Sequence, residues 1–193
     1  MKTIICIVGK TGTGKDTIAK YLYNKYGIDA ICSYTTREKR DYETDGKEHW
    51  FITKDKMDYI KNNEHMLGYT INDKTGIEYC ATAESINDNY VVYIINPNGI
   101  KYMQKHLPEG FVLKYIYCEL DENIIEQRVL NRGDDLEVFR KRISSEREEF
   151  DTYRDSKQYD ILIDTSKDLE SMYKQVDNFI ATIMWDFIRI IKI

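Results

Sequence analysis

The sequence Gly9-Lys10-Thr11-Gly12-Thr13-Gly14-Lys15 joins an apolar run, Thr3–Val8, to an amphipathic stretch, Lys15–Tyr26. It matches the pattern GxxxxGK in the strand–loop–helix context that a phosphate-binding loop requires. The glycines let backbone N–H groups turn inward around phosphate oxygens, and the helix N-terminus adds the positive end of its dipole. The side chain of Lys15 can reach the β- and γ-phosphates of ATP. The stretch therefore predicts an ATP-binding loop in an α/β protein of the P-loop NTPase class, with Lys15 as a catalytic residue.

The two residues after Lys15 extend the expected ATP site and bear on metal binding. Most such loops place Ser or Thr directly after the lysine, where its hydroxyl binds Mg²⁺. This chain has Asp16 there, followed by Thr17. Either the Thr17 hydroxyl or the Asp16 carboxylate can supply the oxygen ligand that Mg²⁺ prefers. Asp16 can equally be an acid that the helix dipole favours in the first turn. We expect ATP as phosphoryl donor together with Mg²⁺, with the metal ligand left open between these residues.

Short apolar runs alternate with helical patterns along most of the chain. Further strands are expected at Ala30–Ser33, Tyr90–Ile95, Val112–Cys118 and Ile161–Ile163. Further helices are expected at Gly99–His106, Ile124–Asn131, Leu136–Tyr153 and Leu169–Ile193. This alternation predicts a parallel sheet with helices on both faces.

The middle of the chain, Thr35–Ser85, breaks this alternation. Asp45-Gly46 between polar residues is a hairpin signal. A strand is expected at His49–Thr53 and a helix at Lys54–Asn63, and Gly68–Ala81 is expected to form short strands or a loop. The segment therefore predicts a small inserted β-rich subdomain.

Seven of the nine arginines fall into two groups. One group is Arg37 and Arg40, and the other lies within a 20-residue window: Arg128, Arg132, Arg140, Arg142 and Arg147. Phosphoryl transfer between two phosphorylated substrates requires cations that offset their charge, and the planar guanidinium binds phosphate bidentately. Such clustering in an acidic protein therefore predicts two phosphate-binding regions.

The second group of arginines is expected to form a small helical lid. Arg128 and Arg132 are four residues apart and so share one face of a helix. Asp134-x-x-Glu137 resembles a capping box for the next helix, which carries Arg142. We expect Arg128, Arg132 and Arg142 to point inward as catalytic residues. The other two arginines of this group are expected to form surface ion pairs with nearby glutamates.

The segment from residue 33 to residue 51 resembles the acceptor-binding segment of the guanylate kinase family. That family reads S-x-T-T-R-x-x-R-x-x-E-x-x-G-x-x-Y-x-F, and every fixed position except the tyrosine matches here. The stretch reads Ser33-Tyr34-Thr35-Thr36-Arg37-Glu38-Lys39-Arg40-Asp41-Tyr42-Glu43-Thr44-Asp45-Gly46-Lys47-Glu48-His49-Trp50-Phe51. Together with the phosphate loop and the lid arginines, the resemblance covers most of the chain.

The resemblance implies a kinase that transfers the γ-phosphoryl group of ATP to GMP or dGMP. It implies one domain over residues 1–193, with an acceptor-binding insert at 34–85, a lid at 128–153 and a core at 1–33, 86–127 and 154–193. The acceptor-binding residues that it implies are Ser33, Arg37, Arg40, Glu43, His49, Tyr79 and Asn96. By this resemblance, Arg37 and Arg40 hold the acceptor phosphate, with Tyr79 assisting. Glu43 orients an arginine, and Ser33 contacts the base.

Several positions depart from the family's pattern where guanine is read. The carboxylate that binds the N1 and N2 hydrogens of guanine corresponds to Leu67, and a base-contacting serine corresponds to Ala81. The family's Asp-x-Asp is replaced by a sequence that ends in Asn96. Glu64 or Glu78 can supply the missing carboxylate instead. The acceptor is therefore GMP or dGMP, or alternatively another (deoxy)nucleoside monophosphate.

Composition and charge bound the remaining possibilities. The net charge of −5 disfavours nucleic acid and anionic membranes as partners, and leaves small-molecule nucleotides. The chain shows no signal peptide, and its apolar C-terminal run is too short to span a membrane, so we expect a cytoplasmic protein. Its oligomeric state stays open between monomer and homodimer. A P-loop hydrolase or switch, and a non-catalytic nucleotide-binding module, are the competing classes, although Lys15 argues against the module.

Overall fold

The computed structural model describes residues 1–41, 43–72, 75–133 and 135–191, with the side chains of residues 132 and 185–191 left undescribed. The chain forms two compact units. One unit comprises Met1–Cys6 and Ile28–Lys114, and the other comprises Ile7–Gly27 and Tyr115–Ile193. Strands β1 (Lys2–Val8) and β7 (Phe111–Glu119) contribute residues to both units. The division into core, insert and lid stays a prediction.

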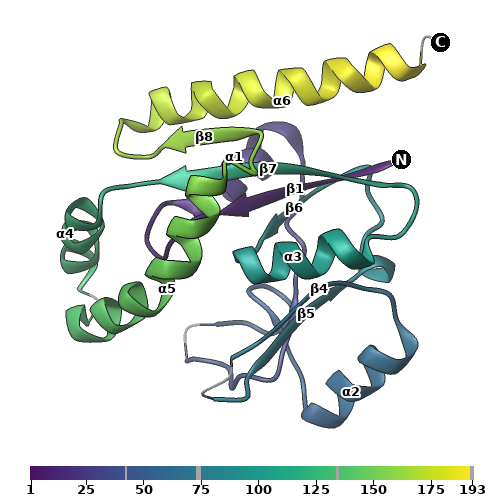
Figure 1. Ribbon diagram of the computed structural model, residues 1–193, viewed down its shortest axis with the longest axis horizontal. Helices are drawn as coiled ribbons and strands as arrows, with labels where there is room; N and C mark the ends of the chain where they lie inside the picture. Colours follow the sequence, from purple (N-terminus) through teal and green to yellow (C-terminus); the bar gives the residue numbers. More distant parts are fainter. Residues whose placement is uncertain (42, 73–74, 134, 192–193) are drawn as a thin grey trace. The chain divides into compact units, whose positions relative to one another are not determined.

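The first sheet has four strands in the order β6-β1-β7-β8, with β6 at Tyr90–Ile94 and β8 at Ile161–Asp164 (Figure 1). Strands β7 and β8 pair in parallel. Residues 3–8 of β1 are all buried, as expected for a strand covered on both faces. The predicted α/β fold with a parallel sheet is confirmed.

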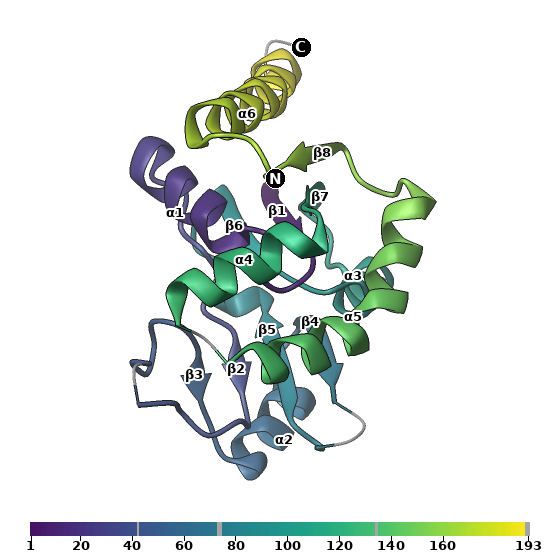
Figure 2. The same ribbon diagram turned by 90° about the vertical axis from the view of Figure 1, so that its left-hand side faces the viewer.

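Four helices belong to the second unit: α1 (Lys15–Tyr26), α4 (Glu122–Arg132), α5 (Leu136–Ser156) and α6 (Leu169–Ile191). Helix α6 lies beside α1 and β8, as Figures 1 and 2 both show. Helices α4 and α5 share an apolar cluster that includes Ile125, Val129, Phe139 and Ile143. This cluster fixes the two helices that carry the second arginine group. Among the described helices, none combines the length and the apolar composition needed to cross a membrane.

The first unit contains a second sheet in the order β3-β2-β5-β4 (Figure 2). Its strands are β2 (Tyr34–Thr35), β3 (Trp50–Phe51), β4 (Met66–Ile71) and β5 (Glu78–Thr82). Strand β5 pairs antiparallel with β2 and β4, and β2 pairs in parallel with β3. A single 3₁₀ turn, η1, follows at Ala83–Ser85. The predicted β-rich segment is thus a small mixed sheet.

Two helices complete the first unit: α2 (Lys54–Asn63) and α3 (Pro97–His106). Thr53 caps α2, and its side chain accepts a hydrogen bond from a backbone N–H of the first turn. On one face of the second sheet, Met57 and Ile60 of α2 pack against Cys80 of β5. Helix α3 packs against β4.

The strand predicted at Ala30–Ser33 is wrong. Only Ala30 forms a bridge, to Val92 of β6. The carbonyl of Ser33 instead accepts from the N–H of Trp50 in the second sheet. Because the segment changes hydrogen-bonding partners within four residues, no continuous ladder forms.

Two local signals were also misread from the sequence. Asp45-Gly46 starts a tight turn, closed by a bond from the Gly46 N–H to the His49 carbonyl (2.9 Å), and not a hairpin. The reason is that β3, which follows, runs parallel to β2. The N-cap of α5 is Asp135, whose carboxylate accepts from two backbone N–H groups. Asp134, which we had expected to cap this helix, lies outside the described residues.

Candidate active site

The phosphate loop connects β1 to α1 and depends on glycine. Gly9, Gly12 and Gly14 all have positive φ angles, of 155°, 83° and 85°. A Cβ atom on Gly12 would lie 2.4 Å from Cγ2 of Ile125 in α4, so only glycine fits there. The Thr13 hydroxyl donates to the Lys10 carbonyl at 2.8 Å, which closes the loop on itself. The loop predicted from the sequence is therefore formed at the expected residues.

Lys15 lies folded against its own loop. Its ammonium donates to the carbonyl oxygens of Gly9 and Lys10, both at 2.7 Å. Burial is the main cause that lowers the pKa of Lys15, and nearby acidic groups, Asp16 among them, oppose the shift. A desolvated ammonium gains most from an anionic partner, and phosphate oxygens would be one.

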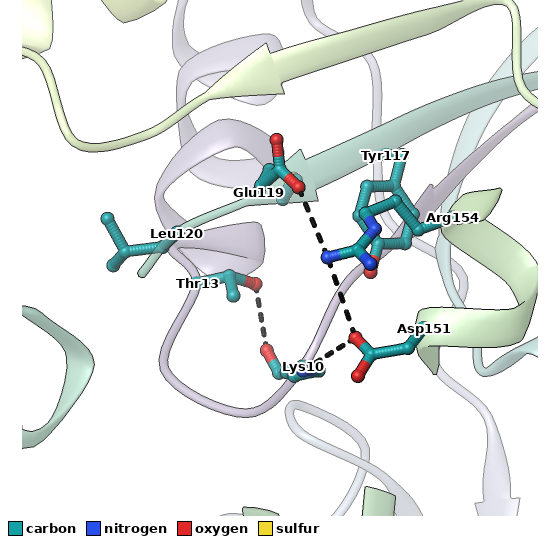
Figure 3. A pocket seen from close by; sticks show the side chains of 8 residues that line it. Lys10, Thr13, Tyr117, Glu119, Leu120, Asp151 and Arg154 are labelled. Atoms are coloured by element: carbon teal, nitrogen blue, oxygen red, sulfur yellow. Dashed lines mark hydrogen bonds and ion pairs between the residues drawn. The ribbon is translucent and has the colours of Figure 1, made fainter. Parts of the chain in front are cut away.

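Lys10 makes contacts that its place in the loop did not predict. Its ammonium pairs with Glu122 of α4 at 2.9 Å and with Asp151 of α5 at 2.7 Å. Figure 3 shows the pair with Asp151. Burial pulls the pKa of Lys10 down, but these two carboxylates outweigh it and leave the pKa raised. Arg154 lies near the same Asp151 carboxylate at 3.7 Å. The Lys10 side chain therefore anchors the loop to two helices. Only the backbone of Lys10 is then left to contact a nucleotide.

A small cavity of about 30 Å³ lies beside this anchor (Figure 3). Its lining includes Lys10, Tyr117 and Glu119. A volume of this size accommodates one or two water molecules and no nucleotide. The cavity is therefore a packing feature behind the loop, and we assign no ligand to it.

Glu146 of α5 is a contact of the loop that sequence reasoning missed. Its carboxylate accepts from the Thr11 backbone N–H at 2.7 Å and from the Thr11 hydroxyl at 2.8 Å. The same carboxylate accepts from Nε of Arg142 at 2.9 Å. An anionic group thus sits on donors of the phosphate loop. The only signal in the sequence was the four-residue spacing between Arg142 and Glu146.

The lid arginines are placed differently from one another. Arg128 donates to the Thr165 carbonyl after β8 at 2.7 Å, and Arg142 is mostly exposed. The side chain of Arg132 lies outside the described part of the chain. Arg140 and Arg147 form exposed ion pairs with glutamates of α4, at 2.8 and 2.6 Å, as predicted for a salt-laced surface.

The first turn of α1 presents oxygen atoms that fit a magnesium ion. Asp16 is exposed and Thr17 is half-buried there. No group of three or more His, Cys, Asp or Glu side chains arranged for a metal exists among the described residues. Mg²⁺ commonly keeps several waters and binds only one or two protein oxygens besides substrate phosphates. Oxygen atoms of Asp16 or Thr17 would match this pattern, and the magnesium site stays a prediction.

In the other unit, Arg37 and Glu43 form a bidentate ion pair. The two nitrogen–oxygen distances are 2.9 and 2.7 Å, and the Glu43 carboxylate also accepts from the Arg40 backbone N–H at 2.8 Å. The Glu43 side chain is only 5% exposed, whereas that of Arg40 is 50% exposed. The hydrogen bonds from Arg37 are the main cause that lowers the pKa of Glu43 to about 2. The pair fixes Arg37 in one orientation.

Ser33, His49 and Tyr79 gather around this pair. Oγ of Ser33 lies 2.9 Å from Nδ1 of His49. The His49 ring meets Tyr79 edge-on, with centroids 5.6 Å apart, and Arg37 lies over the Phe51 ring at 5.3 Å. Burial, and after it the charge of Arg37, lowers the pKa of His49. Residues far apart in the sequence thus form one cationic and aromatic cluster.

The residues considered for reading the base lie elsewhere. Glu78 is buried, accepts from the Tyr69 hydroxyl at 2.7 Å and pairs with Lys61 of α2. Because side chains alternate along a strand, Glu78 faces α2 and points away from the side that Tyr79 occupies. This placement disfavours Glu78 as the base-reading carboxylate.

The other four positions are Asn96, Glu64, Leu67 and Ala81. Asn96 caps α3, and its amide oxygen accepts from the Gly99 N–H at 2.8 Å. Glu64 is half-buried at the C-cap of α2, and both Leu67 and Ala81 are fully buried. Asn96, Leu67 and Ala81 thus offer no free side-chain acceptor to a guanine base, whereas Glu64 acts electrostatically on Tyr34, the neighbour of Ser33.

A sequence model described as guanylate kinase matches residues 1–183. The rice protein named guanylate kinase 2, chloroplastic/mitochondrial, is 23% identical over 182 residues; the match covers 92% of this chain but only 63% of that protein. The guanylate kinase of Clostridioides difficile is 28% identical over 184 residues, covering 93% of this chain and 87% of that one. The crystal structure of guanylate kinase from Anaplasma phagocytophilum has the same fold, with a TM-score of 0.63, 17% identity, and coverage of 94% and 85%.

Proposed function

The chain belongs to the guanylate kinase family, and from that premise we propose that it transfers the γ-phosphoryl group of ATP to GMP or dGMP. The observation that carries this proposal is the phosphate loop with its glycine geometry and Lys15. A module that only binds a partner has no need of a lysine held at such a loop. We propose that the protein is cytoplasmic and that its partners are small-molecule nucleotides and not nucleic acid.

The donor nucleotide is assigned to the loop from Gly9 to Thr17. Backbone N–H groups of the loop and the N-terminus of α1 bind the phosphates, and Lys15 bonds their outer oxygens. Mg²⁺, held by Asp16 or Thr17, supplies charge neutralisation across the phosphates when it is bound. Arg128, Arg132 and Arg142 offset the charge that spreads over the transferring group.

The acceptor phosphate is assigned to the cluster around Arg37. Glu43 holds the Arg37 guanidinium in a fixed plane, which lowers the entropy cost of binding a phosphate. Arg40, whose side chain reaches solvent, adds a second cation, and Tyr79 adds a hydroxyl. Little covalent chemistry is required of the protein, because phosphoryl transfer depends on positioning and electrostatic stabilisation.

One observation favours a second candidate for the acceptor, a nucleoside monophosphate with a different base. Leu67 and Ala81 offer no side-chain acceptor, and the amide oxygen of Asn96 is used by the cap of α3. An unpaired buried donor of guanine would cost about 1–3 kcal/mol. We therefore propose weak base discrimination and keep another (deoxy)nucleoside monophosphate as the alternative acceptor.

Product analysis tests the proposal. Purified protein with ATP, Mg²⁺ and GMP should form ADP and GDP in equal amounts, and the variant Lys15→Ala should form neither. Free phosphate released without GMP would support a hydrolase or switch instead. ATP binding without any product would support a non-catalytic module.

A further inference from the structure

The acceptor-phosphate cluster is one positive charge short of its substrate. The charged groups that act most strongly on His49 are Arg37, Glu43 and Arg40. Arg37 and Glu43 neutralise each other, so the three groups sum to one positive charge. A phosphate monoester carries nearly two negative charges above its second pKa of about 6. Lys39 donates from its ammonium to the Glu43 backbone carbonyl at 3.0 Å, which draws that charge to the outer side of the ion pair. Lys39 and its neighbours Glu38 and Asp41 are exposed residues of both signs, so salt screens their charges.

His49 occupies the place where this missing charge can appear. The ring is half-buried and contacts Ser33 through Nδ1, at 2.9 Å from the hydroxyl oxygen. Its other neighbours are two aromatic rings, Tyr79 at 5.6 Å and Phe51 at 5.9 Å between centroids. Burial and the Arg37 charge favour the neutral ring when no anion is present. A phosphate dianion beside the ring reverses this balance, because an opposite charge within about 4–6 Å favours the charged form.

We infer that His49 takes up one proton from solvent when the acceptor phosphate binds, and thereby becomes the third cation of the acceptor-phosphate cluster. This inference rests on the proposed function, because it assigns that cluster to the acceptor phosphate. The protonated ring donates from both nitrogens. Nδ1 then donates to Oγ of Ser33, and Nε2 donates to a phosphate oxygen. A neutral ring can also make both contacts, with Nδ1 accepting from the Ser33 hydroxyl, but it brings no positive charge to the phosphate.

Proton uptake by His49 makes the affinity for the acceptor phosphate depend on pH, whatever base the acceptor carries. Proton uptake coupled to binding makes the affinity rise as the pH falls, by up to about tenfold per pH unit. This rise is confined to the pH range between the lowered pKa of free His49 and the raised pKa of the bound ring, and it ends near pH 6, where the acceptor phosphate itself becomes a monoanion. A tyrosine at this position, as in the family's pattern, would bind phosphate through its hydroxyl without this linkage.

Calorimetric titration of GMP in two buffers of different ionisation enthalpy, such as HEPES and Tris, measures the protons taken up. At pH 7.5 the GMP phosphate is already almost fully dianionic, so it releases few protons of its own. We expect proton uptake of up to one proton per GMP, and the same uptake with AMP. His49→Phe keeps an aromatic ring but has no ring nitrogen, and should bind GMP roughly 10- to 100-fold more weakly with no uptake.

Matched variants isolate the effect. His65 is an exposed histidine paired with Glu84, so His65→Phe should take up protons as the wild type does. His49→Tyr should bind GMP without uptake. If His49→Phe fails to fold, histidine signals in the NMR spectrum of the wild type serve instead, and the pKa of His49 should rise on addition of GMP.

Two results would overturn the inference while leaving the proposed function intact. One is GMP binding by the wild type without proton uptake, and the other is uptake that persists in His49→Phe or His49→Tyr. Failure to bind any monophosphate would contradict the proposed function instead.

Discussion

Arg37 and Arg40 should respond differently to removal, although the sequence motif treats them alike. Arg37 is 14% exposed and makes both bonds to the Glu43 carboxylate, whereas Arg40 is 50% exposed with its guanidinium 3.9 Å away. Among the described residues, the Arg40 N–H and that distant guanidinium are the partners that the buried carboxylate keeps in Arg37→Ala. Arg37→Ala should therefore damage both stability and GMP binding, and Arg40→Ala should damage binding alone.

The magnitudes follow from burial. Breaking a buried ion pair costs about 3–5 kcal/mol, and the remaining Arg40 contacts reduce this to about 2–4 kcal/mol. For a domain of this size, such a loss lowers Tm by roughly 5–15 °C. Arg40→Ala removes an exposed contact worth about 0.5 kcal/mol or less, so Tm should fall by no more than about 2 °C. Both variants should lose about 2–5 kcal/mol of GMP affinity.

Thermal unfolding and separate titrations of GMP and ATP check this prediction. The double variant Arg37→Ala/Glu43→Ala should regain part of the stability lost in Arg37→Ala, because no carboxylate is then left buried without its partner. The reasoning is refuted if Arg40→Ala lowers Tm as much as Arg37→Ala, or if the double variant is no more stable than the single one. Equal losses of GMP and ATP affinity would place these arginines outside the acceptor site.

Three further variants probe the phosphate loop. Lys15→Ala should lower turnover by more than a hundredfold, or about 3 kcal/mol, with a native circular dichroism spectrum; more than a tenth of the activity remaining contradicts its role. Glu146→Gln should bind ATP about three- to tenfold more tightly by calorimetry, because its carboxylate competes with phosphate for the loop, whereas Glu126→Gln, a control on an exposed ion pair, should match the wild type. Gly12→Ala should lower Tm by several degrees and weaken ATP binding, because its Cβ would lie 2.4 Å from Ile125 at a φ of 83°; an unchanged melting curve would show that the loop tolerates the side chain.

Helices α1 and α2 have the bounds that the sequence predicts, because residues at their ends determine where they stop and start. Gly27 ends α1 in the left-handed conformation, and Thr53 caps α2 with its hydroxyl. The expected strand at Ala30–Ser33 failed because the backbone partner of each residue depends on tertiary placement, which β-propensity does not contain.

In the candidate site as well, contacts between residues close in the sequence were predictable and contacts between distant residues were not. The loop, Arg37 and Glu43 were predictable because close sequence spacing places them together. The contacts that anchor the loop could not be predicted, because their partners are distant in the sequence. Lys10 pairs with Glu122, 112 residues away, and Thr11 donates to Glu146, 135 residues away. A pattern of charges on a helix predicts that ion pairs form, but it does not identify the partner of each charged residue in the folded protein.

The most direct test of the central claim is ATP consumption by the purified protein with each nucleoside monophosphate in turn, supplied with Mg²⁺. We predict turnover with GMP and dGMP, at a kcat/KM tens to hundreds of times higher than with AMP, because phosphate contacts are retained while base contacts are reduced. Near-absolute selectivity for GMP would mean that a carboxylate reads the base, with Glu64 the first residue to change. A pyrimidine or adenine monophosphate as the best acceptor would contradict the assigned substrate. No consumption with any monophosphate would contradict the assignment as a kinase.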